Sequence, residues 1–229
     1  MSAQQGASIG TGFGALDRAT GGLPRGAITE IFGAAGTGKT ALALQMAAAV
    51  QRGGGGAAWI DVEGCFDAAW AAQLGVDVAR MAVARPRAAE EALEMARALA
   101  LSGAVDLVIV DSAAALAAGM ELAAGVGESG EGLRRRVVAS GLRRLDAALR
   151  RSGAAAVFLN QTRARGGAEA GEIAAGGPAL KLFAAMRVAL AGSTENGRVR
   201  FRVRKSRSGG GAAEGELLWR NEAGFAERP

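Results

Sequence analysis

The sequence has no histidine and no tyrosine, one cysteine and only four prolines among its 229 residues. Without histidine, the chain cannot build a histidine-ligated zinc site or use an imidazole as a general base. The lone cysteine, Cys65, excludes an internal disulfide and suits a reducing compartment, and we interpret it as a small packing residue. No apolar run approaches the length of a membrane span, and the N-terminal residues lack the pattern of a signal peptide. We therefore expect a cytoplasmic protein that does not contact a membrane.

The composition indicates one folded domain with a basic surface. Half of the residues are apolar and the mean hydropathy is +0.16, so a chain of this length can bury a substantial core. The formal net charge is +5 and the isoelectric point is near 10.5. This charge favours an anionic partner such as nucleic acid, although many proteins with a similar charge bind none.

Short β-type runs alternate with helical stretches, which is typical of an α/β fold with a mostly parallel, twisted sheet flanked by helices. The expected strands are 27–33, 57–64, 105–112 and 154–161, and the main expected helices are 39–51, 87–103 and 132–151. An Asn-Gly pair at 196–197 leads into a basic strand and predicts a C-terminal β-hairpin. Two glycine-rich segments, 119–132 and 163–177, match no pattern. Each follows the end of a strand, where α/β proteins bind ligands, but each could also be a surface linker.

The clearest motif is G-x-x-x-x-G-K-[ST], which runs from Gly33 to Thr40 between an expected strand and an expected helix. This pattern is typical of a phosphate-binding loop. Backbone N–H groups of residues 36–39 would surround phosphates at a helix N-terminus, where the helix dipole favours anions. The Lys39 ammonium would reach the β- and γ-phosphates, and the Thr40 hydroxyl would bind Mg²⁺. The nucleotide-binding residues predicted from the motif are Gly33, Gly36, Thr37, Gly38, Lys39 and Thr40.

Three polar residues at strand ends could complete a site for a magnesium–nucleotide complex. Asp111 closes the apolar run "LVIVD" and could hold the metal ion. Glu63, at the end of "WIDVE", could orient and deprotonate a water molecule, or it could cap the helix that follows. Gln161, at the end of "VFLNQ", could detect the γ-phosphate through a hydrogen bond, although polar residues are ordinary at strand ends.

The order and spacing of these motifs resemble the ATPase core of the bacterial RecA family over residues 9 to 225. The segments that carry the resemblance are "IGTGFGALD" (9–17), "GGLPRG" (21–26), "GKT", "IDVE", "LGVD" (74–77), "SGAVDLVIVDSAAAL" (102–116), "NQTR" (160–163), "GGPALK" (176–181) and "VRKSR" (203–207). The resemblance implies ATP with Mg²⁺ as cofactors. It also implies that Glu63 is the activating carboxylate, Asp111 the acid of the metal site and Gln161 the γ-phosphate switch.

Further residues gain an expected role only through this resemblance. Trp70 stands where the family stacks an aromatic ring on adenine, with Asp67 beside it. Lys205 and Arg207 are similar to basic residues that reach the ATP site of a neighbouring subunit, so ATP hydrolysis would require assembly. The segments 119–132 and 163–177 correspond to the two DNA-binding loops of the family. The residues expected to contact single-stranded DNA there are Arg136, Arg143, Arg163, Arg165, Gly176 and Gly177.

The sequence also departs from the family pattern. We expect a flexible N-terminus at 1–8 and an ATPase domain at 9–229, with neither the N-terminal polymerisation element nor the C-terminal domain of RecA. Glu131 and Gly166 replace large apolar side chains that wedge between bases, so we expect weak DNA binding. The opening residues are similar to those of ImuA-type accessory proteins of SOS mutagenesis. That subgroup works beside RecA and an ImuB-type polymerase-like protein in translesion DNA synthesis.

These features favour an ATP-binding protein of DNA repair, recombination or SOS mutagenesis that modulates RecA or DNA and hydrolyses ATP slowly by itself. A self-sufficient, DNA-dependent ATPase and strand-exchange recombinase is one alternative, because the expected catalytic set is complete. Another alternative is a regulatory binding module that is not an enzyme and in which ATP only stabilises the fold. The arginine-rich helix 132–151 could be a solvated surface or a DNA contact; in the RecA family the corresponding helix follows the first DNA loop.

Overall fold

The computed structural model describes residues 8–116, 128–164, 172–174, 177–207 and 213–226. They form an α/β fold around a ten-stranded sheet, beside a separate pair of short strands, β1 (Ser8–Ile9) and β2 (Leu23–Pro24). Most of the expected flexible N-terminus lies outside the described residues, but Ser8 pairs with Pro24 in the first of these strands. No helix in the described ranges is both long enough and apolar enough to cross a bilayer.

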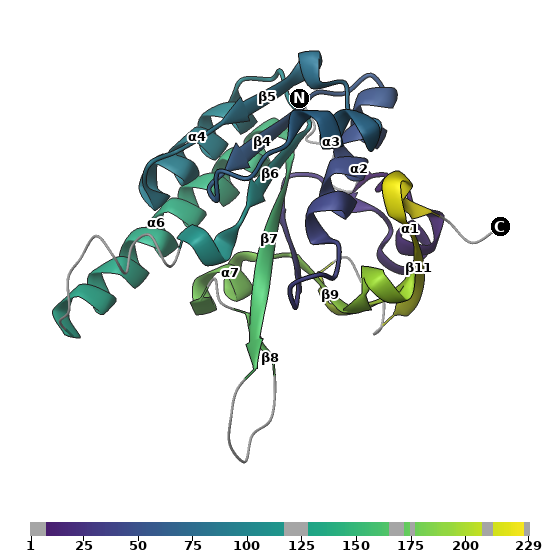
Figure 1. Ribbon diagram of the computed structural model, residues 1–229. Helices are drawn as coiled ribbons and strands as arrows, with labels where there is room; N and C mark the ends of the chain where they lie inside the picture. The colour runs from purple at the N-terminus through teal and green to yellow at the C-terminus, as the bar shows by residue number, and fades with distance from the viewer. Residues whose placement is uncertain (1–7, 117–127, 165–171, 175–176, 208–212, 227–229) are drawn as a thin grey trace.

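Six strands make up the parallel part of the large sheet, in the order β9-β3-β7-β6-β4-β5 (Figure 1). Their bounds are Ile28–Gly33 for β3, Ala57–Asp61 for β4, Met81–Ala84 for β5, Leu107–Asp111 for β6, Ala155–Ala164 for β7 and Met186–Ser193 for β9. The first four residues of β6 are buried, as expected for a strand covered on both faces. Because all six strands run the same way, their carboxyl ends share one edge of the sheet. The predicted fold class is confirmed.

Beyond β9 the sheet continues with three antiparallel strands, β10 (Arg198–Ser206), β11 (Glu214–Arg220) and β12 (Gly224–Ala226). β9 and β10 form the predicted hairpin, whose 3-10 turn Thr194–Asn196 ends at Gly197 with a φ of 67°. The antiparallel part is larger than the expected hairpin, because β11 pairs with β10 and β12 pairs with β11. A further short strand, β8 (Glu172–Ala174), pairs with the end of β7.

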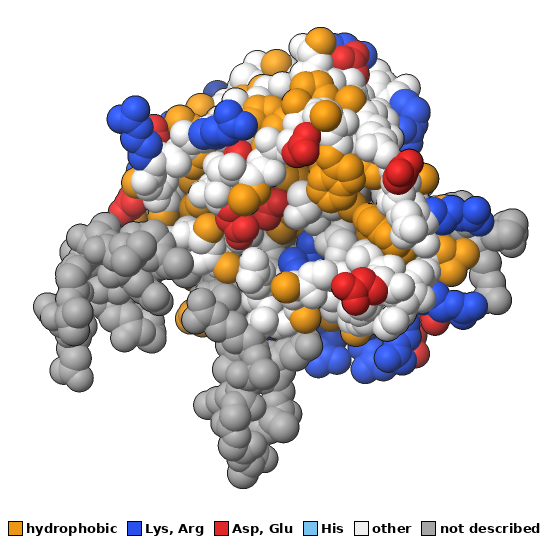
Figure 2. All heavy atoms as spheres, in the orientation of Figure 1, with side chains coloured by type: hydrophobic (Ala, Val, Ile, Leu, Met, Phe, Trp, Pro, Cys, Tyr) orange, Lys and Arg blue, Asp and Glu red, His pale blue; other side chains and the backbone are white. Residues whose placement is uncertain are grey.

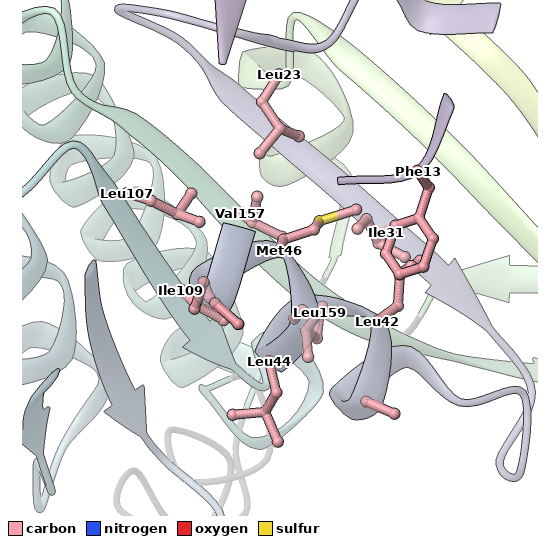
Figure 3. Close-up of a cluster of buried hydrophobic side chains, with 14 of the residues drawn as sticks. Phe13, Leu23, Ile31, Leu42, Leu44, Met46, Leu107, Ile109, Val157 and Leu159 are labelled. Atoms are coloured by element: carbon pink, nitrogen blue, oxygen red, sulfur yellow. The ribbon is translucent and has the colours of Figure 1, made fainter. Parts of the chain in front are cut away.

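Helices cover both faces of the sheet (Figure 1). One face packs against α1 (Gly14–Thr20), α2 (Lys39–Arg52) and α3 (Ala68–Gln73), and the other packs against α4 (Ala89–Leu101), α6 (Glu128–Ser152) and α7 (Gly177–Phe183). Figure 3 shows the core beneath α2, where Leu42 and Met46 meet side chains of the central strands. The other buried residues of α2 include Ala41, Ala43, Ala47 and Ala48, each 0% exposed. These small side chains let the helix lie close to the sheet and fix its N-terminus at the carboxyl edge.

Some element boundaries differ from those expected from the sequence. α6 begins at Glu128, so the first unassigned segment, 119–132, ends inside a helix. In this helix Leu142, Leu145 and Leu149 recur at helical spacing and are buried, so they lie on the face that packs against the sheet. β4 ends at Asp61 and not at residue 64, because the next two N–H groups both donate to the Asp111 carbonyl of the neighbouring strand. The second unassigned segment, 163–177, includes the short β7–β8 pairing.

Candidate nucleotide-binding site

The phosphate loop connects β3 to α2 at the carboxyl edge of the sheet. Gly36 and Gly38 have φ values of 75° and 78°, a left-handed conformation that glycine adopts readily. Lys39 is the first residue of α2, and its ammonium donates to the carbonyls of Gly33 (3.0 Å) and Ala34 (2.7 Å). Thr37 is 0% exposed, and its hydroxyl donates to the Ala34 carbonyl at 2.9 Å. The loop therefore folds around its own lysine at the start of a long helix, as a phosphate-binding loop requires.

Thr40 and Asp111 come together as the sequence predicts. The Thr40 hydroxyl donates to the Asp111 carboxylate at 3.0 Å. The pKa of Asp111 is raised to about 6, chiefly by burial; Glu63 and Asp61 contribute to the increase, while Thr40 and Lys39 act in the opposite direction. Burial also lowers the pKa of Lys39, against the attraction of Asp111 and Glu63. The charges of Lys39, Asp111 and Glu63 therefore influence one another at this edge of the sheet.

The two residues fit a magnesium site. Within the described ranges, no cluster of three or more His, Cys, Asp or Glu side chains could hold a metal ion by itself. A hydroxyl and one carboxylate are what Mg²⁺ takes from the protein when phosphate oxygens and water supply its other ligands. Thr40 and Asp111 are therefore the residues that would hold such an ion.

Glu63 lies on the turn that follows β4, next to Asp111. The N–H groups of Val62 and Glu63 donate to the Asp111 carbonyl at 2.8 and 3.3 Å, and the Ser112 hydroxyl donates to the Glu63 carboxylate. Glu63 is exposed, whereas Ser112 is 2% exposed. In Figure 2, acidic and basic side chains lie close together near the middle of the face that is drawn. The carboxylate is thus held in place while it remains accessible.

Two residues that hold Glu63 in position were not predicted. Ser112 is one of them, and its only signal in the sequence is that it follows Asp111 at the end of an apolar strand. The other is Asp61, 3% exposed, whose carboxylate accepts from the N–H groups of Cys65 (2.9 Å) and Phe66 (3.1 Å) and from Arg85 (3.1 Å). Asp61 therefore fixes the turn that carries Glu63.

Gln161 is at the same edge of the sheet. In the pairing of β3 with β7 it lies opposite Gly33, the first residue of the loop, and its side chain is exposed. The position allows its amide to contact a phosphate bound at the loop. Asp67 caps α3 by accepting from the N–H groups of Ala69 (2.8 Å) and Trp70 (3.0 Å). Trp70 is partly buried against the core on the α2 side.

Lys205 and Arg207 lie at the C-terminal end of α7. The Lys205 ammonium donates to the carbonyls of Lys181 (2.9 Å) and Leu182 (3.1 Å), and the Arg207 guanidinium donates to that of Leu182 (3.2 Å). Burial lowers the pKa of Lys205, and the adjacent Arg207 lowers it further. Within one chain these contacts are those of a helix C-terminus, so a role at a second ATP site rests on the resemblance alone.

The expected DNA-binding residues are only partly described. Arg136 and Arg143 are exposed on α6, and Gly177 is the first residue of α7 with a φ of 79°. Arg163 belongs to β7, and its side chain lies outside the described part of the structure. Arg165, Gly166 and Gly176 lie outside the described residues, and the side chain of Glu131 is not described either.

The chain is similar to known proteins over most of its length. The profile of the RecA N-terminal domain matches residues 2–203. The chain is 46% identical over 189 residues to the RecA protein of Rubrobacter xylanophilus, a match that covers 81% of this chain and 55% of that protein. It is 45% identical over 184 residues to Thermus aquaticus RecA (79% and 54%) and 42% identical over 212 residues to Aquifex aeolicus RecA (87% and 61%). The chain thus spans about half the length of the curated relatives that it matches.

Proposed function

We propose that this chain, which belongs to the RecA N-terminal domain family, is a magnesium-dependent ATP-binding protein of DNA repair or recombination. The observation that carries the proposal is the convergence of Lys39, the Thr40–Asp111 pair and Glu63 at one edge of the sheet. A loop of the right sequence without the carboxylates would support only phosphate binding. The carboxylates add a metal site and a base, which a nucleotide-hydrolysing site needs.

Each group has a distinct part in this proposal. The loop N–H groups and the Lys39 ammonium bind the β- and γ-phosphates, so the ammonium exchanges loop carbonyls for phosphate oxygens. Thr40 and Asp111 would hold Mg²⁺, which would supply positive charge beside the phosphates. Glu63 accepts a proton from a water molecule whose oxygen bonds to the γ-phosphorus, while the bond from that phosphorus to the bridging oxygen of ADP breaks. Gln161 senses whether the γ-phosphate is present.

The proposed partners, single-stranded DNA and a neighbouring subunit, follow from the resemblance to RecA, and exposed arginines on α6 support the first of them. Arg136 and Arg143 offer guanidinium groups to the phosphates of single-stranded DNA. Lys205 and Arg207 would leave the carbonyls of α7 to reach the γ-phosphate of a neighbouring subunit, so we expect hydrolysis per molecule to rise with protein concentration. A cytoplasmic location belongs to the same proposal.

The test is ATP binding and hydrolysis with and without single-stranded DNA, with Glu63→Gln as the blank. We expect a fluorescent ATP analogue to bind in the presence of Mg²⁺, and hydrolysis that is lost in the blank while binding is kept. Lys39→Ala should abolish binding. If the folded wild-type protein binds no nucleotide at any Mg²⁺ concentration, the proposal is wrong.

Two finer readings can be separated by experiment. Strong stimulation of hydrolysis by DNA, with pairing of homologous strands, would support a self-sufficient recombinase, which the complete set of site residues favours. The reading as an accessory protein of SOS mutagenesis rests on the similarity of residues 11–31 to the ImuA-type opening. It predicts direct binding to RecA filaments, or to an ImuB-type protein, that depends on ATP. Partner binding that survives Lys39→Ala would instead support a regulatory module.

A further inference from the structure

The last described strand, β12, lies against the helix that follows the phosphate loop. The Gln45 side chain on α2 donates to the carbonyls of Phe225 (2.9 Å) and Ala223 (3.3 Å) and accepts from the Phe225 N–H (2.8 Å). Phe225 faces Trp219 in the pairing of β11 with β12. Alternate residues of an antiparallel pair turn their N–H and C=O groups away from the partner strand. Those of Phe225 meet the Gln45 amide, which takes the place of a neighbouring strand.

The Phe225 ring lies against Gly38 of the loop. A Cβ atom added to Gly38 would be 2.6 Å from the ring, so the ring and the loop backbone are in contact. Phe225 is 3% exposed, and its ring meets those of Trp219 and Phe13 edge to face, with centroids 5.1 and 6.4 Å away. Aromatic contacts of this geometry hold the ring in one orientation. It is therefore a fixed surface against which Gly38 rests.

A second contact from the antiparallel part of the sheet reaches the other left-handed glycine of the loop. Both the N–H and the hydroxyl of Thr194 donate to the Gly36 carbonyl, at 3.1 and 3.2 Å. Thr194 lies in the turn between β9 and β10. The two glycines that shape the loop are thus each held by residues more than 150 positions away in the sequence.

From these contacts we infer that the C-terminal strand sets the conformation of the phosphate loop, with Gln45 and Phe225 as positioning residues. Glycine loses more conformational freedom on ordering than any other residue. A loop that is already ordered by β12 binds a ligand without that cost. Because coupling is reciprocal, nucleotide bound at the loop should in turn hold β12 in place. This last step rests on the proposed ATP site, whereas the ordering of the loop by β12 does not.

The chain offers a matched control on the same helix. Gln51 makes the same pair of contacts with a different partner: its amide donates to the Asp77 carbonyl and accepts from the Asp77 N–H, both at 2.9 Å. Gln51→Leu therefore removes two hydrogen bonds from α2 and Gln45→Leu removes two of the same kind plus the longer one to Ala223, and only Gln45→Leu touches β12. Phe225→Leu is a second test variant that keeps an apolar side chain but shortens the contact with Gly38.

The experiment is hydrogen exchange of the nucleotide-free protein, followed by mass spectrometry over residues 34–44. We expect Gln45→Leu and Phe225→Leu to speed exchange there about tenfold, with Gln51→Leu close to wild type. In the same variants an ATP analogue should bind about tenfold more weakly, and ATP should slow exchange of residues 219–226 in the wild type.

The outcomes separate this inference from the proposed function. Equal exchange over 34–44 in Gln45→Leu and Gln51→Leu, with no effect of Phe225→Leu, would overturn the inference whether or not ATP binds. Faster exchange in both test variants of a protein that binds no nucleotide would support the ordering of the loop and refute the ATP site. Faster exchange without weaker binding would refute the coupling.

Discussion

Replacing Asp111 with asparagine should stabilise the ligand-free protein at neutral and basic pH. The pKa of Asp111 is raised from 3.8 to about 6, chiefly by burial and in smaller part by the nearby carboxylates of Glu63 and Asp61. The folded protein therefore holds this proton more tightly than the unfolded chain does, and ionising the carboxylate opposes folding. Asparagine carries no charge, and its carbonyl can still accept the hydrogen bond that Thr40 donates at 3.0 Å.

The magnitude and its pH dependence follow from the two pKa values. For one titrating group, the destabilisation of the wild type relative to the variant is negligible below the unfolded pKa of 3.8. It reaches about 2 kcal/mol at pH 5 and levels off at about 3 kcal/mol above pH 7. We expect the free energy of unfolding of the variant to exceed that of the wild type by about 1–3 kcal/mol at pH 8. The gain can be smaller than the full destabilisation because the site is partly solvated.

Urea denaturation at pH 5 and pH 8, with EDTA and without nucleotide, measures the effect. The matched control is Asp61→Asn on the adjacent strand, where Asp61 pairs in register with Asp111. That carboxylate accepts hydrogen bonds from two backbone N–H groups and from Arg85, so its loss should destabilise the fold by about 1–3 kcal/mol. A variant Asp111→Asn that is less stable than wild type at pH 8, or whose gain does not grow between the two pH values, would refute the reasoning.

Three further predictions concern other contacts. Ser112→Ala should slow ATP hydrolysis about tenfold with little change in nucleotide affinity, because Glu63 loses its hydroxyl donor; an unchanged steady-state rate would contradict this. Gly33→Ala should lower the free energy of unfolding, measured by urea denaturation, by about 3 kcal/mol, because the added Cβ would lie 2.4 Å from a backbone oxygen of β9. Gly36→Ala should lower it by only about 1 kcal/mol, because its Cβ would meet no atom within 4 Å and only the left-handed backbone is unfavourable. Arg187→Leu should lower the free energy of unfolding by about 3 kcal/mol, because it leaves the buried Glu30 (1% exposed) without its ion pair. Adding Glu30→Gln, which removes the charge but keeps an oxygen that accepts the hydrogen bond from Asn160, should restore much of that loss; a further loss in the double variant would contradict this.

Local patterns predicted the parts of the site that belong to single elements. The phosphate loop, the strand that ends at Asp111 and the helix from Lys39 each depend on residues adjacent in sequence. Since parallel strands end at one edge, placing Glu63 and Gln161 near the loop required only the fold class. The inward face of α6 was also predictable, because Leu142, Leu145 and Leu149 recur at helical spacing.

Contacts between distant segments were not predictable in this way. Nothing in the sequence around Gln45 indicates that its amide pairs with the backbone of Phe225, because the contact depends on how β11 and β12 fold back. The same holds for Thr194 and the Gly36 carbonyl. The end of β4 at Asp61 was missed for a related reason. The N–H groups of the two residues that follow it, Val62 and Glu63, donate to the carbonyl of Asp111, and that partner is set by the order of strands in the sheet.

The electrostatic state of the site also depends on the folded structure. Lys39 and Asp111 carry opposite charges, yet burial lowers the pKa of the first and raises that of the second. Their mutual attraction therefore does not offset the loss of solvation, and the ammonium donates to loop carbonyls instead of to the carboxylate. Anionic phosphate beside Lys39 and a cation beside Asp111 would each favour the charged form of its neighbour. A site that opposes its own charges in this way gains stability on binding a metal–phosphate complex, which is the chemistry expected of a magnesium–nucleotide site.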